Sequence, residues 1–181
     1  MKSFITSLAI LAMLATTMPV SAATVSAEPG QLIKGSLSTV YYYGTDGKRY
    51  VFPTEKTYKS WYGEDFSTVV TIPDSELMTI PLGGNVTYRP GVKLIKITTD
   101  PKTYAISQGG TLRWIETEEV AIALYGSDWN TKIDDLPDPF FVNYRIGSSI
   151  AEKGEYNPNG ERSTTLYIWQ DKSMTAPASM Q

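Results

Sequence analysis

The side chains of this sequence that could carry out chemistry are carboxylates, lysines and aromatic rings, because its 181 residues include no cysteine and no histidine. Without cysteine there can be no disulfide, thiolate nucleophile or zinc–thiolate site. Without histidine there can be no Ser-His-Asp triad and no imidazole metal ligand. We therefore expect no catalytic residue in this chain, and a carboxylate-based glycoside hydrolase is the remaining enzymatic alternative.

Three pairs of acidic residues are candidates for that alternative, because they recur at a spacing of 63 or 64 residues. The pairs are Glu55/Glu118, Asp65/Asp128 and Asp74/Asp138. A glycosidase needs two carboxylates about 5–10 Å apart across a cleft. Each of these acids lies at the predicted start or end of a helix, where a capping role already accounts for it.

We expect no cofactor, and calcium is the one ion that the sequence leaves open. Oxygen ligands bind Ca²⁺ without help from cysteine or histidine. Asp134, Asp135 and Asp138 lie close together in the sequence, and Glu64 and Asp65 are adjacent. The sequence has no EF-hand loop, and aspartates in solvated turns are the simpler interpretation of these groups.

Aromatic residues are abundant, with 12 Tyr, 4 Trp and 5 Phe. Rings exposed on a sheet can stack on sugars or hold peptides. Tyr42 and Trp114 lie on the strand face opposite the expected core, so they are our candidate ligand-binding residues. The alternative is that a domain without disulfides buries these rings in its core.

The first 22 residues have the pattern of a signal peptide. Lys2 is followed by an apolar segment, Phe4–Ala15, which is shorter than the roughly 20 residues that span a bilayer. Val20 and Ala22 place small residues at a peptidase site, so the mature chain is expected to begin at Ala23, followed by a linker up to residue 30. An uncleaved N-terminal anchor is the alternative.

The charge of the chain limits its partners. The net charge is −3, and removal of Lys2 makes it one unit more negative. Such a chain has no basic surface for nucleic acid and no polybasic segment for membrane lipids. We expect a secreted, extracellular or cell-surface protein that contacts neither nucleic acid nor, after cleavage, the membrane.

An internal repeat organises the chain. Residues 31–91 form repeat 1 and residues 92–150 form repeat 2, aligned at an offset of 63 that becomes 64 near the end. The identical pairs are Tyr41/Tyr104, Gly47/Gly110, Thr54/Thr117, Glu55/Glu118, Tyr62/Tyr125, Gly63/Gly126, Asp65/Asp128, Thr68/Thr131, Pro73/Pro137, Asp74/Asp138 and Gly83/Gly147. Self-similarity at a fixed spacing indicates that one structural unit occurs twice.

Each repeat predicts a β-hairpin, a helix, a strand and a short helix. In repeat 1 the β-prone runs 40–43 and 49–52 flank a Gly-rich turn. A two- or four-residue loop places Tyr41, Tyr43, Tyr50 and Phe52 on one face, which we assign to the core. Thr54 is the expected N-cap of the helix and Gly63 its end. The fold class is α+β: a tandem duplication of this unit sharing one core.

The region after the repeats has a different composition. Residues 151–170 predict a loop followed by a terminal strand at 164–169, and residues 171–181 predict a disordered tail.

Repeat 1 contains five short motifs: Val40–Tyr43, Gly47–Pro53, Asp65-Phe66, Pro73–Leu77 and Ile80–Gly83. Together they resemble a poorly characterised β-hairpin–helix repeat of secreted and cell-surface bacterial proteins, in particular two-repeat proteins of candidate-phylum bacteria. Repeat 2 departs from the pattern, with Glu116 in place of the proline and Phe140-Phe141 in place of Glu-Leu. The resemblance implies an extracellular accessory role and assigns no catalytic residue.

These observations lead to one functional hypothesis and two alternatives. We expect a secreted non-catalytic binding module of the bacterial cell surface or envelope, whose partner is an envelope glycan or a surface protein. The first alternative is a structural surface protein that self-assembles through exposed sheet edges. The second is the carboxylate-dependent hydrolase.

Overall fold

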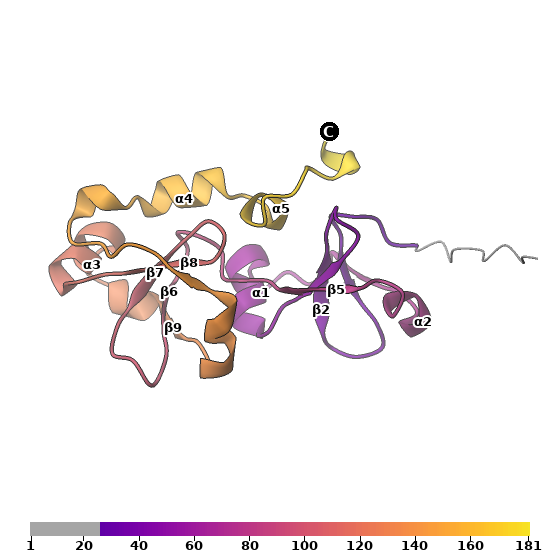
Figure 1. Ribbon diagram of the computed structural model, residues 1–181, viewed down its shortest axis with the longest axis horizontal. Coiled ribbons are helices and arrows are strands. Elements are labelled where there is room, and N and C mark those ends of the chain that lie inside the picture. Colours follow the sequence, from indigo (N-terminus) through magenta and orange to yellow (C-terminus); the bar gives the residue numbers. More distant parts are fainter. Residues whose placement is uncertain (1–25) are drawn as a thin grey trace, which may run out of the picture.

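The computed structural model describes residues 26–181, which form two five-stranded mixed sheets with helices (Figure 1). The expected signal peptide lies outside the described residues. Of the expected linker, residues 26–30 are described, and Ala27 is buried against the first sheet. Helices and mixed sheets together confirm the α+β class.

The first sheet has the strand order β4-β1-β2-β3-β5. Its three central strands are antiparallel, and the two outer strands run parallel to their neighbours. Two helices, α1 and α2, belong to this half of the chain. The elements are β1 Leu32–Lys34, β2 Val40–Tyr43, β3 Arg49–Val51, α1 Glu55–Tyr62, β4 Val69–Thr71, α2 Asp74–Leu77 and β5 Leu82–Asn85.

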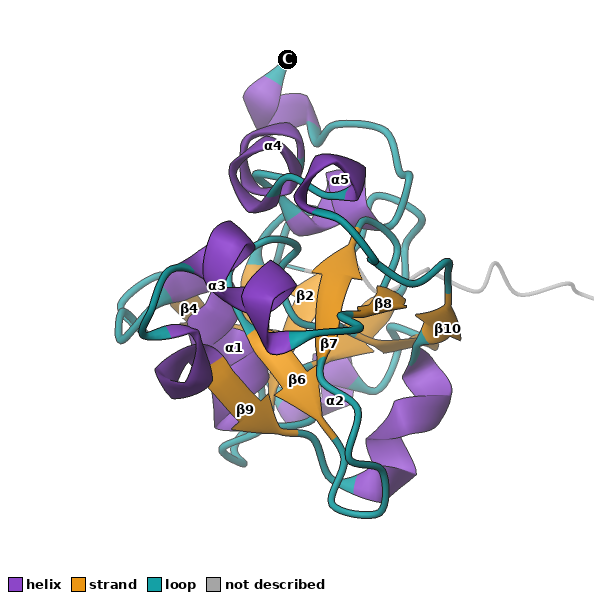
Figure 2. Cartoon of the chain, turned by 90° about the vertical axis from the view of Figure 1, so that its left-hand side faces the viewer, coloured by secondary structure: helices purple, strands orange, loops and turns teal. Residues whose placement is uncertain are grey.

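The second sheet has the order β10-β8-β7-β6-β9, with the same pattern of antiparallel centre and parallel edges. Read from its β9 end, its strands follow one another in the same topological order as those of the first sheet. Figure 2 shows this sheet face with α3 beside it. The elements are β6 Leu94–Lys96, β7 Tyr104–Ser107, β8 Thr111–Trp114, α3 Glu118–Tyr125, the 3₁₀ helix η1 Trp129–Lys132, β9 Ile133–Asp135, the 3₁₀ helix η2 Asp138–Asn143 and β10 Arg145–Ile146.

The two long helices begin and end at the residues that the sequence predicts. The hydroxyl of Thr54 accepts a hydrogen bond from the Thr57 N–H at 3.1 Å, and that of Thr117 accepts one from the Val120 N–H at 3.3 Å. Each N-cap satisfies a backbone donor that the first helical turn leaves unpaired. Gly63 ends α1 with a φ of +63°, a conformation that other residues rarely adopt.

The hairpin turn between β2 and β3 has three residues, which overturns the expected assignment of faces. The Gly44 N–H donates to the Lys48 carbonyl at 2.8 Å, so only residues 45–47 form the loop, with Gly47 at a φ of +76°. Tyr42 therefore pairs with Tyr50, and residues directly opposite each other share a face. Placing Tyr42 on an outer face was wrong because a loop with an odd number of residues reverses the parity.

The expectation of one shared core is also not met, because both faces of each sheet are covered. The buried apolar residues of the described chain form four clusters, two on each sheet, and no cluster contains strand residues of both sheets. Helix α1 and the later helix α5 (Ile168–Asp171) pack on one face of the first sheet, and α2 packs on the other. Helix α3 and η2 cover the two faces of the second sheet.

The chain between the sheets contributes buried residues to both halves. Val86 belongs to the cluster beneath α1, and Tyr88 belongs to a cluster of the second sheet; each is 1% exposed. Between them, the Thr87 carbonyl accepts a hydrogen bond from Trp61 Nε1 at 2.8 Å. An ion pair between Lys56 and Asp134, 3.4 Å apart, adds a contact between the halves.

The C-terminal region differs from the expected loop, strand and disordered tail. It contains the 3₁₀ helix η3 Lys153–Glu155, α4 Pro158–Thr164, α5 Ile168–Asp171 and the 3₁₀ helix η4 Ala178–Met180. Asn157 caps α4, and Pro158 occupies its first turn, where proline needs no hydrogen-bond partner. Helices α4 and α5 run along one side of the molecule (Figures 1 and 2).

Burial of a few residues explains why this region orders. Ile168 is 1% exposed and packs in the cluster beneath α1. The Asp171 carboxylate accepts hydrogen bonds from the Gly109 N–H at 2.8 Å and from the Thr87 hydroxyl at 3.2 Å. Pro177 is buried against Gly30, where a Cβ atom would lie 2.6 Å from the proline ring. The prediction of a strand at 164–169 was wrong: these residues end α4 and begin α5, with Thr165 and Ile168 buried.

We predict that Val86→Ala lowers the free energy of unfolding by about 1–3 kcal/mol, because it leaves a cavity in a fully buried position. The measurement is a urea unfolding curve. Val142→Ala is the matched control, because Val142 is 83% exposed and should change stability by less than about 0.5 kcal/mol. Equal urea midpoints for the two variants would contradict an anchoring role for the segment between the two sheets.

Candidate binding pockets

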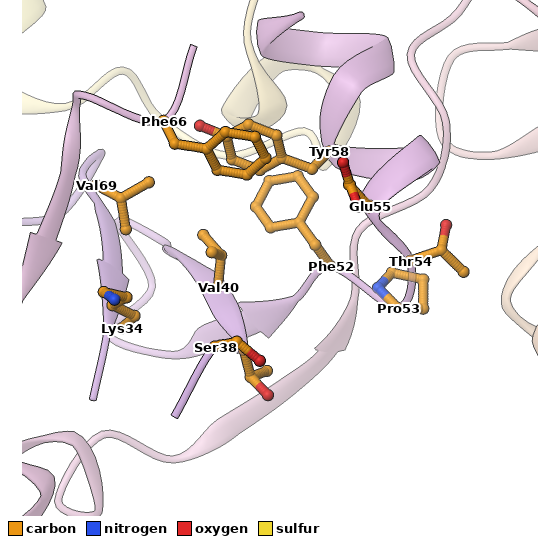
Figure 3. A pocket seen from close by; sticks show the side chains of 11 residues that line it. Lys34, Ser38, Val40, Phe52, Pro53, Thr54, Glu55, Tyr58, Phe66 and Val69 are labelled. Carbon is orange, nitrogen blue, oxygen red and sulfur yellow. The ribbon is translucent and has the colours of Figure 1, made fainter. Parts of the chain in front are cut away.

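The main pocket lies where β1 and β2 meet the start of α1, and we call it the α1 pocket (Figure 3). Its volume is about 520 Å³, within the range of about 300–1,000 Å³ that is usual for small-molecule sites. Its walls combine apolar and aromatic side chains with a few polar ones. The lining residues are Lys34, Ser38, Thr39, Val40, Phe52, Pro53, Thr54, Glu55, Tyr58, Phe66 and Val69.

A group of three aromatic rings forms one wall of the α1 pocket. Phe66 stacks on Tyr58 with ring centroids 4.3 Å apart and planes 7° apart, and Phe52 meets Tyr58 edge-on at 5.2 Å. The Tyr58 hydroxyl donates to the Asp65 carbonyl at 2.6 Å, which holds the ring beneath its partner. Burial, followed by the charge of Asp65, raises the pKa of Tyr58, so this hydroxyl stays protonated. Phe66 itself is 42% exposed and offers an apolar surface to solvent.

Charged groups of opposite sign flank this apolar wall. Figure 3 shows Lys34 on one side of the pocket and Glu55 on the other, with the apolar side chains between them. Glu55 is also 2.6 Å from Lys59, one turn further along α1. The pocket can therefore hold an apolar group and offer an ammonium and a carboxylate to the polar ends of the same ligand.

A second pocket of about 340 Å³ lies at the start of α3, and we call it the α3 pocket. All of its lining residues except Trp114 are the counterparts, 63 positions later, of residues that line the α1 pocket. They are Pro101, Lys102, Thr103, Trp114, Ile115, Glu116, Thr117, Glu118, Ala121 and Trp129. Both halves of the chain therefore have a pocket at the corresponding position.

The two pockets differ in their walls. Ala121 replaces Tyr58 and Ile115 replaces Phe52, so the aromatic group of the α1 pocket has no full equivalent. Lys102 lies over the Trp114 ring, with its nitrogen 5.0 Å from the ring centre. Glu116 adds an acid where the α1 pocket has Pro53. The α3 pocket is the smaller and the more polar of the two.

The two predicted ligand-binding residues have different environments and are not brought together. Tyr42 is 2% exposed, so it is not a surface ring; it lines a separate cavity described below. Trp114 is half-buried and lines the α3 pocket. Sequence reasoning missed Phe66, although its alignment with Trp129 marks an aromatic position that both repeats keep.

Most of the recurring acids accept hydrogen bonds or pair with a lysine. Asp65 accepts a hydrogen bond from the Ser67 N–H at 2.8 Å, and Asp74 accepts from the N–H and hydroxyl of Ser36 at 2.9 and 2.6 Å. Asp128 lies 2.6 Å from Lys132. These hydrogen bonds lower the pKa of each of the three carboxyl groups, as expected for acids that stabilise turns.

The residues suggested for calcium are engaged separately. Asp134 faces Lys56, Asp135 lies 3.6 Å from Lys96, and Asp138 accepts hydrogen bonds from the hydroxyls of Thr98 and Thr99. Within residues 26–181, no group of three or more acidic side chains is arranged to hold a metal ion. These contacts lend the calcium hypothesis no support.

No protein-family model, curated protein or solved structure matches this chain. In the described part of the chain, no helix has the length and apolar character needed to cross a membrane.

We predict that acid weakens the fold partly through Asp74. Its folded pKa is lowered by the Ser36 hydrogen bonds, so its contribution is present above the unfolded pKa of about 3.9 and is lost as pH falls through the folded value. Asp74→Asn should show a smaller loss of urea midpoint between pH 6 and pH 2.5 than the unmodified protein. Glu119→Gln, at an exposed position, is the control and should follow the unmodified protein.

Proposed function

We propose that the protein is a secreted, non-catalytic binding module that holds an apolar group of a bacterial cell-envelope partner in the α1 pocket. The observation that carries this proposal is the exposed Phe66 ring, fixed by stacking on Tyr58 beside an open pocket of about 520 Å³. An exposed ring on an ordered wall offers contact area at little entropic cost. The partner is an envelope glycan or a surface protein.

The repeated pocket supports the proposal that the chain arose by tandem duplication. The two sheets have the same strand order, the helices α1 and α3 share their caps, and most of the pocket-lining residues occupy corresponding positions. We infer that one half kept the larger aromatic pocket while the other changed its wall. The two halves would then bind different groups, or only the first would bind.

Self-assembly is a second candidate, favoured by exposed apolar residues at matching places in the two halves. Leu82 on β5 is 61% exposed and Ile146 on β10 is 63% exposed, and both strands lie at a sheet edge. Met78 and Val142 are the next matching pair, at 78% and 83%. Edge strands with apolar side chains can pair with another chain. Light scattering of the purified protein separates the candidates, because a monomer at high concentration argues against assembly.

A carboxylate-based hydrolase receives no comparable support, because five of the six recurring acids already have partners. Asp65, Asp74 and Asp138 accept hydrogen bonds, and Glu55 and Asp128 pair with lysines. Release of reducing sugar from envelope glycan that is lost on changing Glu55 or Glu118 to Gln would overturn the non-catalytic proposal.

We predict that Phe66→Ala weakens co-sedimentation of the protein with bacterial cell envelopes by about tenfold. Loss of a buried aromatic contact at an interface costs about 1–2 kcal/mol, which corresponds to roughly that factor. The control is Val142→Ala, which also removes an exposed apolar side chain but lies outside the pocket. Equal binding by the two variants would exclude the α1 pocket as the contact site.

Export is tested separately from binding. We predict that the protein produced by a bacterial host with its natural N-terminus is exported, and that N-terminal sequencing of the exported form begins at Ala23. A product that retains Met1 and stays with the membrane would favour the uncleaved anchor.

A further inference from the structure

A third cavity lies between the first sheet, the end of α1 and the C-terminal segment, and we call it the α5 cavity. Figure 1 shows α5 and the C-terminal end of the chain above the first half of the molecule. The volume of the α5 cavity is about 370 Å³, which suits a ligand the size of one ring with its substituents. Its residues come from segments that are far apart in the sequence, including Tyr42 and Trp169.

Two hydrogen-bond donors on the lining residues of this cavity lack a partner. The hydroxyl of Tyr42 and Nε1 of Trp169 are both shielded from solvent, and neither has a hydrogen-bond partner within residues 26–181. A buried donor without an acceptor is costly, and about nine in ten buried polar groups in proteins are paired. Burial, followed by the charge of Asp46, raises the pKa of Tyr42 to about 12, so its hydroxyl remains a donor at neutral pH.

Three neighbouring aromatic residues of the same cluster do have hydrogen-bond partners. Tyr50 donates to Asp46 at 2.6 Å, Tyr58 donates to the Asp65 carbonyl at 2.6 Å, and Trp61 donates to the Thr87 carbonyl at 2.8 Å. All of these side chains belong to the cluster that also contains Tyr42. Within this cluster, the buried donors without a partner are those of Tyr42 and Trp169, and both residues line the α5 cavity. Elsewhere in the described chain, Arg49, Tyr125 and Thr165 also have a buried polar atom without a partner.

The rest of the lining indicates what kind of molecule fits. Tyr167 stacks on Trp169 with centroids 5.9 Å apart and planes 10° apart, which presents a flat aromatic surface. Asp65 also lines the cavity; one of its oxygens accepts from Ser67, and its lowered pKa keeps it ionised at neutral pH. Gln31 adds an amide whose oxygen already accepts from the Glu28 N–H at 2.9 Å.

We propose that the α5 cavity binds a neutral pyranose sugar. The ring and hydroxyl oxygens of a sugar accept hydrogen bonds from Tyr42 and Trp169, a sugar hydroxyl donates to Asp65, and the C–H face of the ring packs on aromatic carbon. A purely apolar ligand leaves both donors unpaired. An anionic ligand meets the charge of Asp65. The inference stands whether or not the α1 pocket binds a partner, because the two cavities have no lining residue in common.

The test measures the binding of named sugars to the full purified protein. Glucose and N-acetylglucosamine are titrated while the tryptophan fluorescence is followed, with glucuronate and indole as the anionic and apolar comparisons. Saturable binding of at least one neutral sugar, tighter than that of glucuronate and indole, is expected. Binding of indole alone, of glucuronate alone, or of none of the four compounds overturns the proposal.

Tyr42→Phe removes only the unpaired hydroxyl and therefore gives two readouts with opposite signs. Without sugar its Tm should rise by about 2–4 °C, because the cost of burying an unpaired donor disappears. Its sugar Kd should increase by about tenfold, because one hydrogen bond to the ligand is lost. A Tm that falls, or an unchanged Kd, would contradict a ligand-binding role for the hydroxyl.

Tyr50→Phe is the matched control from the same sheet face. Its hydroxyl is already paired with Asp46 and does not line the α5 cavity. Its Tm should therefore fall while the sugar Kd stays unchanged. Trp169→Phe provides an independent variant: it removes the second donor and should weaken sugar binding, and unchanged binding would again contradict the proposal.

Discussion

The hydrogen bonds of Thr87 join the parts of the structure that form the α1 pocket and the α5 cavity. Its carbonyl accepts from Trp61, which fixes α1 and with it the Tyr58 ring that supports Phe66. Its hydroxyl donates a hydrogen bond to Asp171, the last residue of α5. Helix α5 also contains Trp169, which lines the α5 cavity. In the described chain no strand pairing joins the two sheets, so the contacts of the buried segment between β5 and β6 are important for holding the two halves together. A small polar residue thus connects both sheets to the C-terminal segment.

The two halves show which requirements a shared backbone imposes and which it leaves free. The threonine caps and the glycine helix ends recur because they meet geometric needs of the backbone at those points. The pocket walls differ because a side chain that lines a cavity has fewer packing partners to satisfy. Tyr58 and Ala121 occupy the same place on their helices, yet one supports an exposed ring and the other does not. The two halves share their strand order and helix caps, but their pocket walls present different side chains.

Much of the fold could be predicted from local patterns, and less of the candidate sites. The order of hairpin, helix, strand and short helix was readable because caps and turns act over a few residues. Phe66 and Trp114 were visible as aromatic positions, but a pocket is made by neighbours that are distant in sequence. The face of Tyr42 was assigned wrongly because one residue in a hairpin loop reverses the parity of a whole strand.

The sequence by itself determined the absence of thiol and imidazole groups, the α+β class and the start and end of α1 and α3. Each of these depends on residue type or on contacts within one turn. The tertiary structure decided the environment of Tyr42, the helices after residue 150 and the positions of the α1 pocket and the α5 cavity. Ile168 and Asp171 order the C-terminal segment only by contacting residues more than 60 positions away in the chain. Such contacts form only when the whole chain folds, and no local pattern records them.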